Sequence, residues 1–317
     1  MSTPPPPQRT LLTLSGLSLS DLPPPTATAD VLAPFLTALL AEAIPLVDSL
    51  PTNTTTPPTT RTPTYSYPWT PLSPKSYPPT STAPVHLYSL NTTTGPPQGQ
   101  KEIWIARLSI HTDASCPGTA SFQEFQTFLK DQHVDTEANS TPSVEGVWRG
   151  ARWTGCDGVE VEANGTRWTD FTISALAARH RVGRPVLRDR VFPVVQVTCS
   201  SAAAEEGEGV FLVVSLHVED LLAASSLLPG ASDDDGLPLD QQRVKDRSRE
   251  DVGRGAVVGA YVSVERVRRD GGGSVEWIMA TASDAKGVLP LWVQTRAVPG
   301  QVAVDVPYFL GWVEGQR

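Results

Sequence analysis

The sequence predicts an α+β fold in which a C-terminal helix lies across an antiparallel sheet. Strand-like segments follow one another between residues 158 and 283, and most are joined by Gly-rich or charged turns, as successive hairpins are. From Val288 to Val313, apolar residues recur at helical spacing. Low-complexity sequence rich in Pro, Ser and Thr fills much of the first ~80 positions, so one domain of about 230 residues remains to form the core.

Four regions are expected along the chain. They are a disordered leader (1–29), an N-terminal helix that packs on the domain (30–50), a Pro/Thr-rich linker (51–83) and the domain itself (84–317). Asp30 is a suitable N-cap for a helix from Val31 to about Asp48. The apolar face of this helix comprises Leu32, Phe35, Leu36, Leu39 and Leu40. An alternative for the linker is a polyproline II ligand for a partner protein.

Several segments of the domain have the composition and partial alternation of β-strands. They are 102–112, 158–163, 166–180, 190–200, 209–218, 255–269 and 273–283. The last two flank three consecutive glycines, Gly271 to Gly273, which predicts a β-hairpin. A charged insertion at about 221–254 separates this hairpin from the earlier strands, and it is expected to be a solvated loop.

Two further helices are predicted in the domain. Ser121 and Glu124 form a capping box at the start of a helix. Its apolar stripe comprises Phe122, Phe125, Phe128 and Leu129. In the C-terminal helix, Pro299 suits the first turn of a new helix, whereas Pro307 lies inside the apolar pattern and removes one backbone hydrogen bond. A kinked or two-part helix across the sheet is therefore expected.

Composition excludes several classes of protein. A formal net charge of −9 argues against an extended nucleic-acid-binding surface, because that affinity comes mainly from Lys and Arg. The odd number of cysteines, Cys116, Cys156 and Cys199, fits neither a disulfide framework nor a zinc site and favours a reducing, intracellular compartment. The Leu11–Leu19 segment is a poor signal peptide, and no apolar run approaches the ~18 residues of a membrane span. A cytoplasmic location is expected.

The order of helix, antiparallel sheet and long C-terminal helix resembles the START-like superfamily. The resemblance covers about Ile103 to Val313 and is carried by WIARLSIH, TASFQEF, VEVEANGTRW, RVFPVVQVT, GAYVSVERV and WIMATASDAKGVLPLWVQTRAVPGQVAVDVPYFLGWV. Within the superfamily, the chain is most similar to an uncharacterised fungal family. The resemblance implies a helix-grip fold, in which a curved sheet wraps the last helix and encloses an apolar cavity. START-like relatives bind sterols, phospholipids, ceramides or other hydrophobic molecules, and some are cyclases or hydrolases.

If such a cavity exists, its wall must be mostly apolar, because removing ligand surface from water is worth ~0.8 kcal/mol per methylene. The expected wall residues are Leu212, Val214, Leu216, Val262, Val264, Val275, Trp277, Met279 and Trp292. Strand periodicity alone cannot separate a ligand wall from ordinary core, so both interpretations stay open. If these rows line the cavity, His217 and Glu276 point away from it.

Catalytic signatures are weak. The chain has no G-x-S-x-G, H-E-x-x-H, P-loop or dinucleotide glycine motif. His111 with Asp113 could orient an imidazole, but two polar residues at one strand end are little evidence. No metal or other cofactor is expected.

An arginine cluster surrounds a Gly/Pro turn. It comprises Arg179, Arg181, Arg184, Arg188 and Arg190. Each basic residue near an anionic leaflet adds ~1 kcal/mol, so this segment is a candidate for transient membrane docking. The alternative is that these arginines pair with the abundant acids of the chain.

The sequence therefore predicts a protein that binds, and could carry or sense, a lipid or other hydrophobic small molecule. Two alternatives remain at this point. One is an enzyme of cyclase or hydrolase type that acts on a bulky apolar substrate in the same cavity. The other is an interaction module whose cavity is filled by side chains.

Overall fold

The computed structural model describes residues 10–51, 67–94, 100–181, 188–201, 208–224, 227–228, 255–286 and 291–317. Within these ranges, the side chains of residues 93, 94, 100 and 291–295 lie outside the description. Most of the predicted insertion at 221–254 is also outside it.

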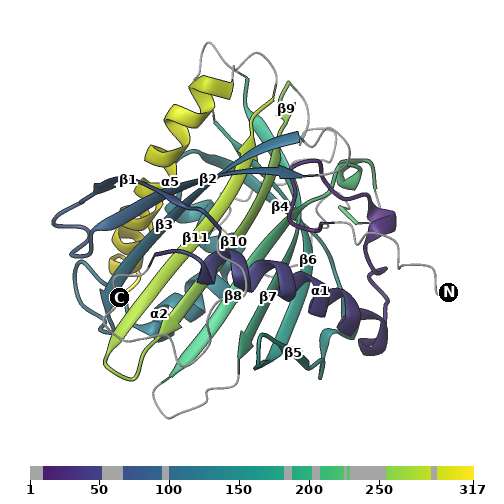
Figure 1. The fold of residues 1–317 in the computed structure, drawn as a ribbon, viewed down its shortest axis with the longest axis horizontal. Helices are drawn as coiled ribbons and strands as arrows, with labels where there is room; N and C mark the ends of the chain where they lie inside the picture. Colours follow the sequence, from purple (N-terminus) through teal and green to yellow (C-terminus); the bar gives the residue numbers. More distant parts are fainter. Residues whose placement is uncertain are drawn as a thin grey trace.

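One strongly curved sheet forms the body of the molecule (Figure 1). Its strands are β1 (Thr70–Lys75), β2 (Val85–Thr94), β3 (Gln100–Thr112), β4 (Val144–Arg152), β5 (Val161–Ala163), β6 (Thr166–His180), β7 (Arg190–Ser201), β8 (Gly209–His217), β9 (Val257–Val258), β10 (Ala260–Arg269) and β11 (Ser274–Asp284). The strand order is β1-β2-β3-β11-β10-β8-β7-β6-β4, with β5 on β6 and β9 on β7. Apart from the short β7–β9 pair, every pairing is antiparallel.

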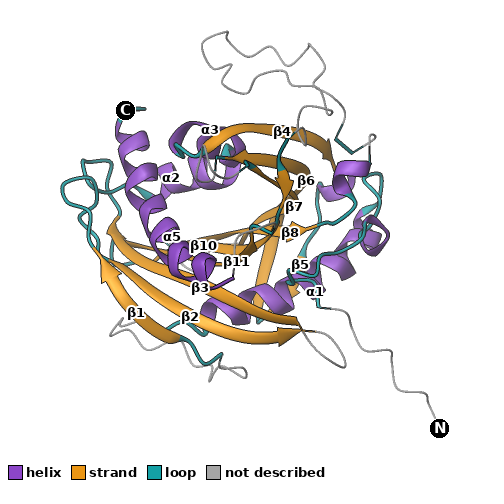
Figure 2. Ribbon diagram, turned by 90° about the horizontal axis from the view of Figure 1, so that it is seen from above, coloured by secondary structure: helices purple, strands orange, loops and turns teal. Residues whose placement is uncertain are grey.

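The helices cover both faces of this sheet. They are α1 (Ala29–Asp48), α2 (Phe122–Phe125), α3 (His133–Ser140) and α5 (Leu291–Glu314). A π-helical turn at Gln126–Asp131 continues α2. Figure 2 shows α2, α3 and α5 on the concave side of the sheet and α1 on the other side. The predicted α+β helix-grip arrangement, a curved antiparallel sheet around a C-terminal helix with a small N-terminal helix, is confirmed.

Strand alternation divides the buried side chains into two cores, because successive residues of a strand point to opposite faces. The outer core lies under α1 and includes Leu212 of β8, Val262 of β10 and Ile278 of β11. The concave core lies under α2 and α5 and includes Phe211 of β8 and Trp277 of β11. Both faces of the central strands are therefore buried.

Residues 10–28, expected to belong to a disordered leader, instead lie on the outer core. Leu12, Leu14 and Leu17 are buried there. The Glu42 carboxylate accepts backbone N–H bonds from Leu11 and Leu12, and the buried Glu102 carboxylate accepts one from Leu14. Apolar burial and satisfied backbone donors together offset the entropy of ordering this segment.

The predicted linker 51–83 is also partly ordered. Residues 70–75 form the edge strand β1, whose side chains are mostly exposed. Pro71 and Pro74 are compatible with this position. Proline has no backbone N–H, and on the open side of an edge strand no neighbouring strand requires one. The Pro/Thr-rich composition therefore predicted a linker at a position where the structure has a strand. Sequence reasoning also missed β2, β4 and α3.

Helix α5 contains both Pro299 and Pro307 and is continuous from Leu291 to Glu314. Of the two alternatives predicted from these prolines, the uninterrupted helix excludes the two-part form. A proline removes a single backbone hydrogen bond, which packing of the neighbouring turns can offset. Val302, Val306, Phe309, Leu310 and Val313 supply that packing against the concave core.

Helix α1 corrects the expectation that no segment is long and apolar enough for a membrane span. Its 20 residues meet that criterion by length and composition. Its leucines, however, are used within the fold, because Leu32, Leu36, Leu39 and Leu40 are buried in the outer core. An amphipathic core helix passes the same composition test as a membrane span.

Replacing Leu36 by Ala tests this packing. Leu36 is fully buried (0% exposed), so we expect Leu36→Ala to lower the free energy of unfolding by about 2–5 kcal/mol. Val31 lies on the same helix but is 51% exposed, and Val31→Ala should change stability by no more than about 0.5 kcal/mol. Urea denaturation of both variants is the measurement. Equal effects of the two substitutions would mean that α1 does not pack on the sheet.

Candidate ligand site on the concave face

Register places the concave side chains in rows that cross the strands. The polar row comprises Ser174 (β6), Gln196 (β7), Ser215 (β8), Ser263 (β10) and Thr281 (β11). The adjacent charged row comprises Thr172, Thr198, Val213, Glu265, Met279 and Arg107. The next row contains Phe211, Val267, Trp277 and Ser109. The concave face is thus apolar at one end and increasingly polar toward the other.

Aromatic side chains fill the apolar end. Phe125 of α2, Phe309 of α5 and Trp277 of β11 contact one another with ring centroids 5.1–5.2 Å apart. His111 lies beside Phe125 and Trp277, at 5.5 and 6.1 Å. Such packing fixes α2 and α5 on the sheet and leaves this end closed.

A buried ion pair lies next to this aromatic cluster. Arg107 Nη2 is 3.0 Å from Glu265 Oε1, and the two residues are 1% and 6% exposed. The Trp277 indole N–H donates to the same carboxylate oxygen at 2.7 Å, while the Arg107 guanidinium stacks 3.8 Å above the Trp277 ring. Arg107 Nε and Nη1 have no hydrogen-bond partner among the described residues. The pair is rigidly positioned but leaves donors unused.

Asp305 of α5 faces this ion pair. Burial raises the pKa of its carboxyl to about 7; the charge of Arg107 opposes that shift, and Glu265 and Glu137 reinforce it. Burial likewise raises the pKa of the Tyr261 phenol on β10. Both side chains nevertheless retain accessible surface. Groups that are deep in the protein and still accessible are those expected to border an internal space.

Ser109 and His111 form a hydrogen bond of 2.8 Å between Oγ and Nε2 on the concave face. Both are fully buried, and burial, followed by the charge of Arg107, lowers the pKa of His111 to about 3. Asp113 does not orient the imidazole, because its carboxylate accepts the Phe122 N–H instead. His111 Nδ1 has no partner in the part of the chain that the structure describes. Ser109 is 0% exposed.

The structure divides the predicted cavity wall between the two faces of the sheet. Val275 and Trp277 lie in the concave core, and Met279 shares their face. In contrast, Leu212, Val214, Leu216, Val262 and Val264 pack in the outer core under α1. The backbone of Trp292 belongs to α5, and its side chain lies outside the described residues. The nine residues are therefore not brought together.

The two polar residues of the same strands show where the error arose. Glu276 lies opposite Trp277 on the outer face, as predicted, and pairs with Arg266 at 2.9 Å. His217, expected to point away from the cavity, shares the concave face with Ser215 and is 2% exposed. Assigning β8 by its apolar residues therefore placed the wrong side of this strand toward the ligand.

Three of the five arginines proposed for membrane docking have partners within the protein. Arg179 pairs with Asp189 at 2.8 Å, and Arg181 pairs with Glu145. Arg190 is buried and donates to the carbonyl of Ala285 at 2.6 Å. Arg188 is exposed, and Arg184 lies outside the described residues. Pairing with acids thus accounts for Arg179 and Arg181, and a backbone carbonyl is the partner of Arg190.

Within the described ranges, no group of three or more His, Cys, Asp and Glu is arranged to hold a metal ion. Glu137 lies between His133 and His180, but its oxygens are 3.8 and 3.7 Å from their Nε2 atoms. All three cysteines are free.

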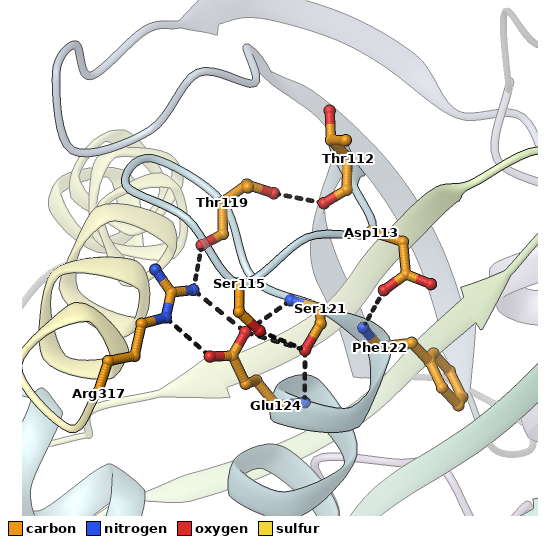
Figure 3. A network of polar contacts seen from close by, with 8 residues as sticks. All are labelled: Thr112, Asp113, Ser115, Thr119, Ser121, Phe122, Glu124 and Arg317. Atoms are coloured by element: carbon orange, nitrogen blue, oxygen red, sulfur yellow. Dashed lines mark hydrogen bonds and ion pairs between the residues drawn. The ribbon is translucent and has the colours of Figure 1, made fainter.

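A polar network fixes the C-terminal end of α5 (Figure 3). Arg317 Nε donates to Glu124 Oε1 at 2.8 Å, and Arg317 Nη2 donates to the Thr119 carbonyl at 2.8 Å. The Glu124 carboxylate also accepts the Ser121 N–H at 2.7 Å, which completes the predicted capping box. This network joins α5 to the first turn of α2.

Comparison with known proteins gives a family and several structures of similar fold. The family model described as "Protein of unknown function (DUF3074)" matches residues 104–313. No curated protein matches the chain.

Three solved human structures are similar to the chain. StAR-related lipid transfer protein 5 is 12% identical with a TM-score of 0.48, and the match covers 90% of this chain and 97% of that chain. STARD10 is 12% identical with a TM-score of 0.45, covering 78% and 74% of the two chains. The lipid transfer and protein localization domain of StarD13 is 15% identical with a TM-score of 0.41, covering 77% and 87%. These similarities concern the fold alone. The match to a family of unknown function agrees with the uncharacterised family predicted from sequence.

The Arg317–Glu124 contact should respond to pH. Burial alone would raise the pKa of the Glu124 carboxyl, but hydrogen bonds from Arg317 and Ser121 lower it to about 2 from 4.5. The stability gained from this carboxylate is present above pH 4.5 and is lost as the pH falls toward 2. We expect Arg317→Ala to cost about 1 kcal/mol at pH 7, and less below pH 4, in urea denaturation. Arg167→Ala, at a half-exposed pair, is the control; an equal effect there would contradict the role of Arg317.

Asp305 should have the opposite pH dependence. Its folded pKa of about 7 exceeds its ordinary 3.8, so its contribution to stability is greatest below pH 3.8 and is lost as the pH rises through 7. Because Asn cannot ionise, Asp305→Asn should become progressively more stable than the natural chain between pH 5 and pH 8. Urea denaturation across this range measures the difference. A constant difference between the two chains would show that Asp305 does not titrate near neutrality.

Proposed function

Because the chain belongs to the DUF3074 family, whose description is a protein of unknown function, we propose from its geometry that it binds a lipid or other hydrophobic small molecule between α5 and the concave face of the sheet. The observation that carries this proposal is the state of Arg107. Its guanidinium is almost fully buried, yet Nε and Nη1 have no partner among the described residues. An unsatisfied buried donor costs about 1–3 kcal/mol, and ligand oxygens that accept these N–H groups would remove that cost.

The groups around Arg107 can bind the apolar part of an amphipathic ligand, while Arg107 binds its polar head. Met279, Phe192 and Tyr261 share the concave face and keep accessible surface, so they can contact apolar carbon. Phe192 and Tyr261 lie 6.1 Å apart, ring to ring. Affinity would come from removing apolar surface from water, and Arg107 would fix the polar head.

The enzyme alternative has one observation in its favour, the Ser109–His111 hydrogen bond. A general base must take up the proton of the nucleophile, however, and burial and the charge of Arg107 lower the pKa of His111 to about 3. Binding therefore remains the proposal, and turnover is an outcome to be tested. No observation favours an interaction module.

We also propose a cytoplasmic location, which the three free cysteines support. Transient contact with an anionic membrane through the exposed Arg188 and through Arg184 belongs to the same proposal. A fungal source and the absence of nucleic-acid binding stay predictions from the sequence.

Native mass spectrometry tests the proposal directly. The protein is purified from a eukaryotic host, and its mass is compared before and after denaturing organic extraction. A stoichiometric hydrophobic molecule released by extraction is the expected result. The absence of any released molecule, together with no thermal shift across a lipid panel at about one hundred times a useful dissociation constant, would overturn it, since a binder gains ~2.7 kcal/mol there.

The role of Arg107 is tested by a matched pair of variants. Arg107→Met should lower the bound fraction at least tenfold. Arg266→Met is the control, because Arg266 is also buried and ion-paired but lies on the outer face, with Glu276 and Asp48 as partners. Arg107→Met/Glu265→Gln removes the uncompensated charge and guards against misfolding. Unchanged occupancy in this folded double variant would exclude Arg107 from the site.

A further inference from the structure

We propose that the ligand is a hydrophobic molecule with several hydroxyl or carbonyl oxygens along one edge and no net negative charge. This inference rests on the proposed function and adds the chemical class of the ligand. The apolar part would lie toward α5, and the oxygenated edge would lie on the polar row of the sheet.

The polar row is unusual for the floor of a site that takes hydrocarbon. Gln196, Ser215 and Ser263 face one another across β7, β8 and β10, and they are 6%, 5% and 5% exposed. Buried polar groups of this kind normally have partners within the fold. Side chains of this kind on adjacent strands therefore need hydrogen-bond partners, which either the fold or a bound molecule must supply.

Two neighbouring sites show how the fold satisfies such groups when it does so itself. The Thr172 and Thr198 hydroxyls, one row away, bond each other at 2.8 Å. Thr281, at the end of the polar row, donates to the Val262 carbonyl at 3.0 Å. In contrast, no hydrogen bond of the Gln196 amide or the Ser215 hydroxyl exists among the described residues. These two side chains are the free part of the row.

The length of the row limits the ligand further. Adjacent strands lie about 4.8 Å apart, so the free side chains of Gln196 on β7 and Ser215 on β8 are separated by about 5 Å. One hydroxyl, such as a simple alcohol carries, can satisfy only one of these positions. A molecule that uses the row must carry oxygens spaced along about this length.

The charges around the site disfavour an anion. Among the described groups whose charges act on Asp305, the acids Glu265 and Glu137 oppose a single cation, Arg107. That cation is already paired with Glu265 at 3.0 Å. Burial lowers the pKa of both His180 and His217, so neither adds positive charge at neutral pH. Close to Asp305, a phosphate or carboxylate head would therefore meet more acidic than basic groups.

Three probes with the same decyl chain separate these possibilities: 1-decanol, decyl β-glucoside and decyl phosphate, each below its micellar concentration. Dissociation constants are measured by native mass spectrometry and thermal shift on the full chain after extraction. We expect decyl glucoside to bind at least tenfold more tightly than both other probes. Equal or tighter binding of decyl phosphate or decanol would overturn the inference while leaving the proposed function intact. Failure of all three probes, with no released molecule in the extraction experiment, would overturn the proposed function itself.

A pair of double variants locates the effect. Gln196→Leu/Ser215→Ala should reduce the preference for decyl glucoside over decanol to within about threefold, because it removes the free polar groups. Thr172→Val/Thr198→Val is the control on the same face, since these hydroxyls already bond each other. Retained decanol binding shows that each variant is folded. A preference lost equally in both variants, or in neither, would contradict the assignment to Gln196 and Ser215.

Discussion

Burial of both faces of the central strands is the constraint on which the rest of this structure depends. Helix α1 and residues 10–28 cover one face, and α2, α3 and α5 cover the other. Each side chain of a central strand therefore lies in one of two interiors, which differ in composition. The outer interior combines the larger apolar cluster with the Arg266–Glu276 pair, whereas the concave interior holds the Arg107–Glu265 pair and the polar row.

The same constraint explains what sequence could and could not predict. The boundaries of β6, β7, β8 and β11 were predicted to within one or two residues, because Gly and charged turns delimit these strands clearly. The face of each strand was not predictable in the same way. In β8, Val213 on one side and Leu212 and Val214 on the other are all apolar, so alternation carries little information. The sign that could have oriented β8 was the pair Ser215 and His217, which lie on the face opposite Leu212 and Val214.

The N-terminal segments were missed for a different reason. Proline and threonine density argued against regular structure, but the segment 10–28 needs little of it. Leu17 forms an isolated bridge to Val218, and the carboxylates of Glu42 and Glu102 replace a ladder as acceptors for backbone N–H groups. Tertiary contacts of single residues, not local propensity, order this segment, and a pattern in the sequence does not reveal such contacts.

The two buried arginines Arg266 and Arg107 differ in how completely they are paired, and we assign the first to stability and the second to ligand binding. Arg266, on the outer face, has both terminal nitrogens paired, with Asp48 of α1 and with Glu276, so it joins the helix to the sheet; only its Nε has no partner among the described residues. Arg107 has one acidic partner and two unused donor atoms beside groups that retain accessible surface. A buried ion pair adds little to stability compared with apolar side chains of similar volume. Retaining an incompletely paired arginine within the concave interior is therefore better explained by a molecule that completes its hydrogen bonds than by the needs of the fold.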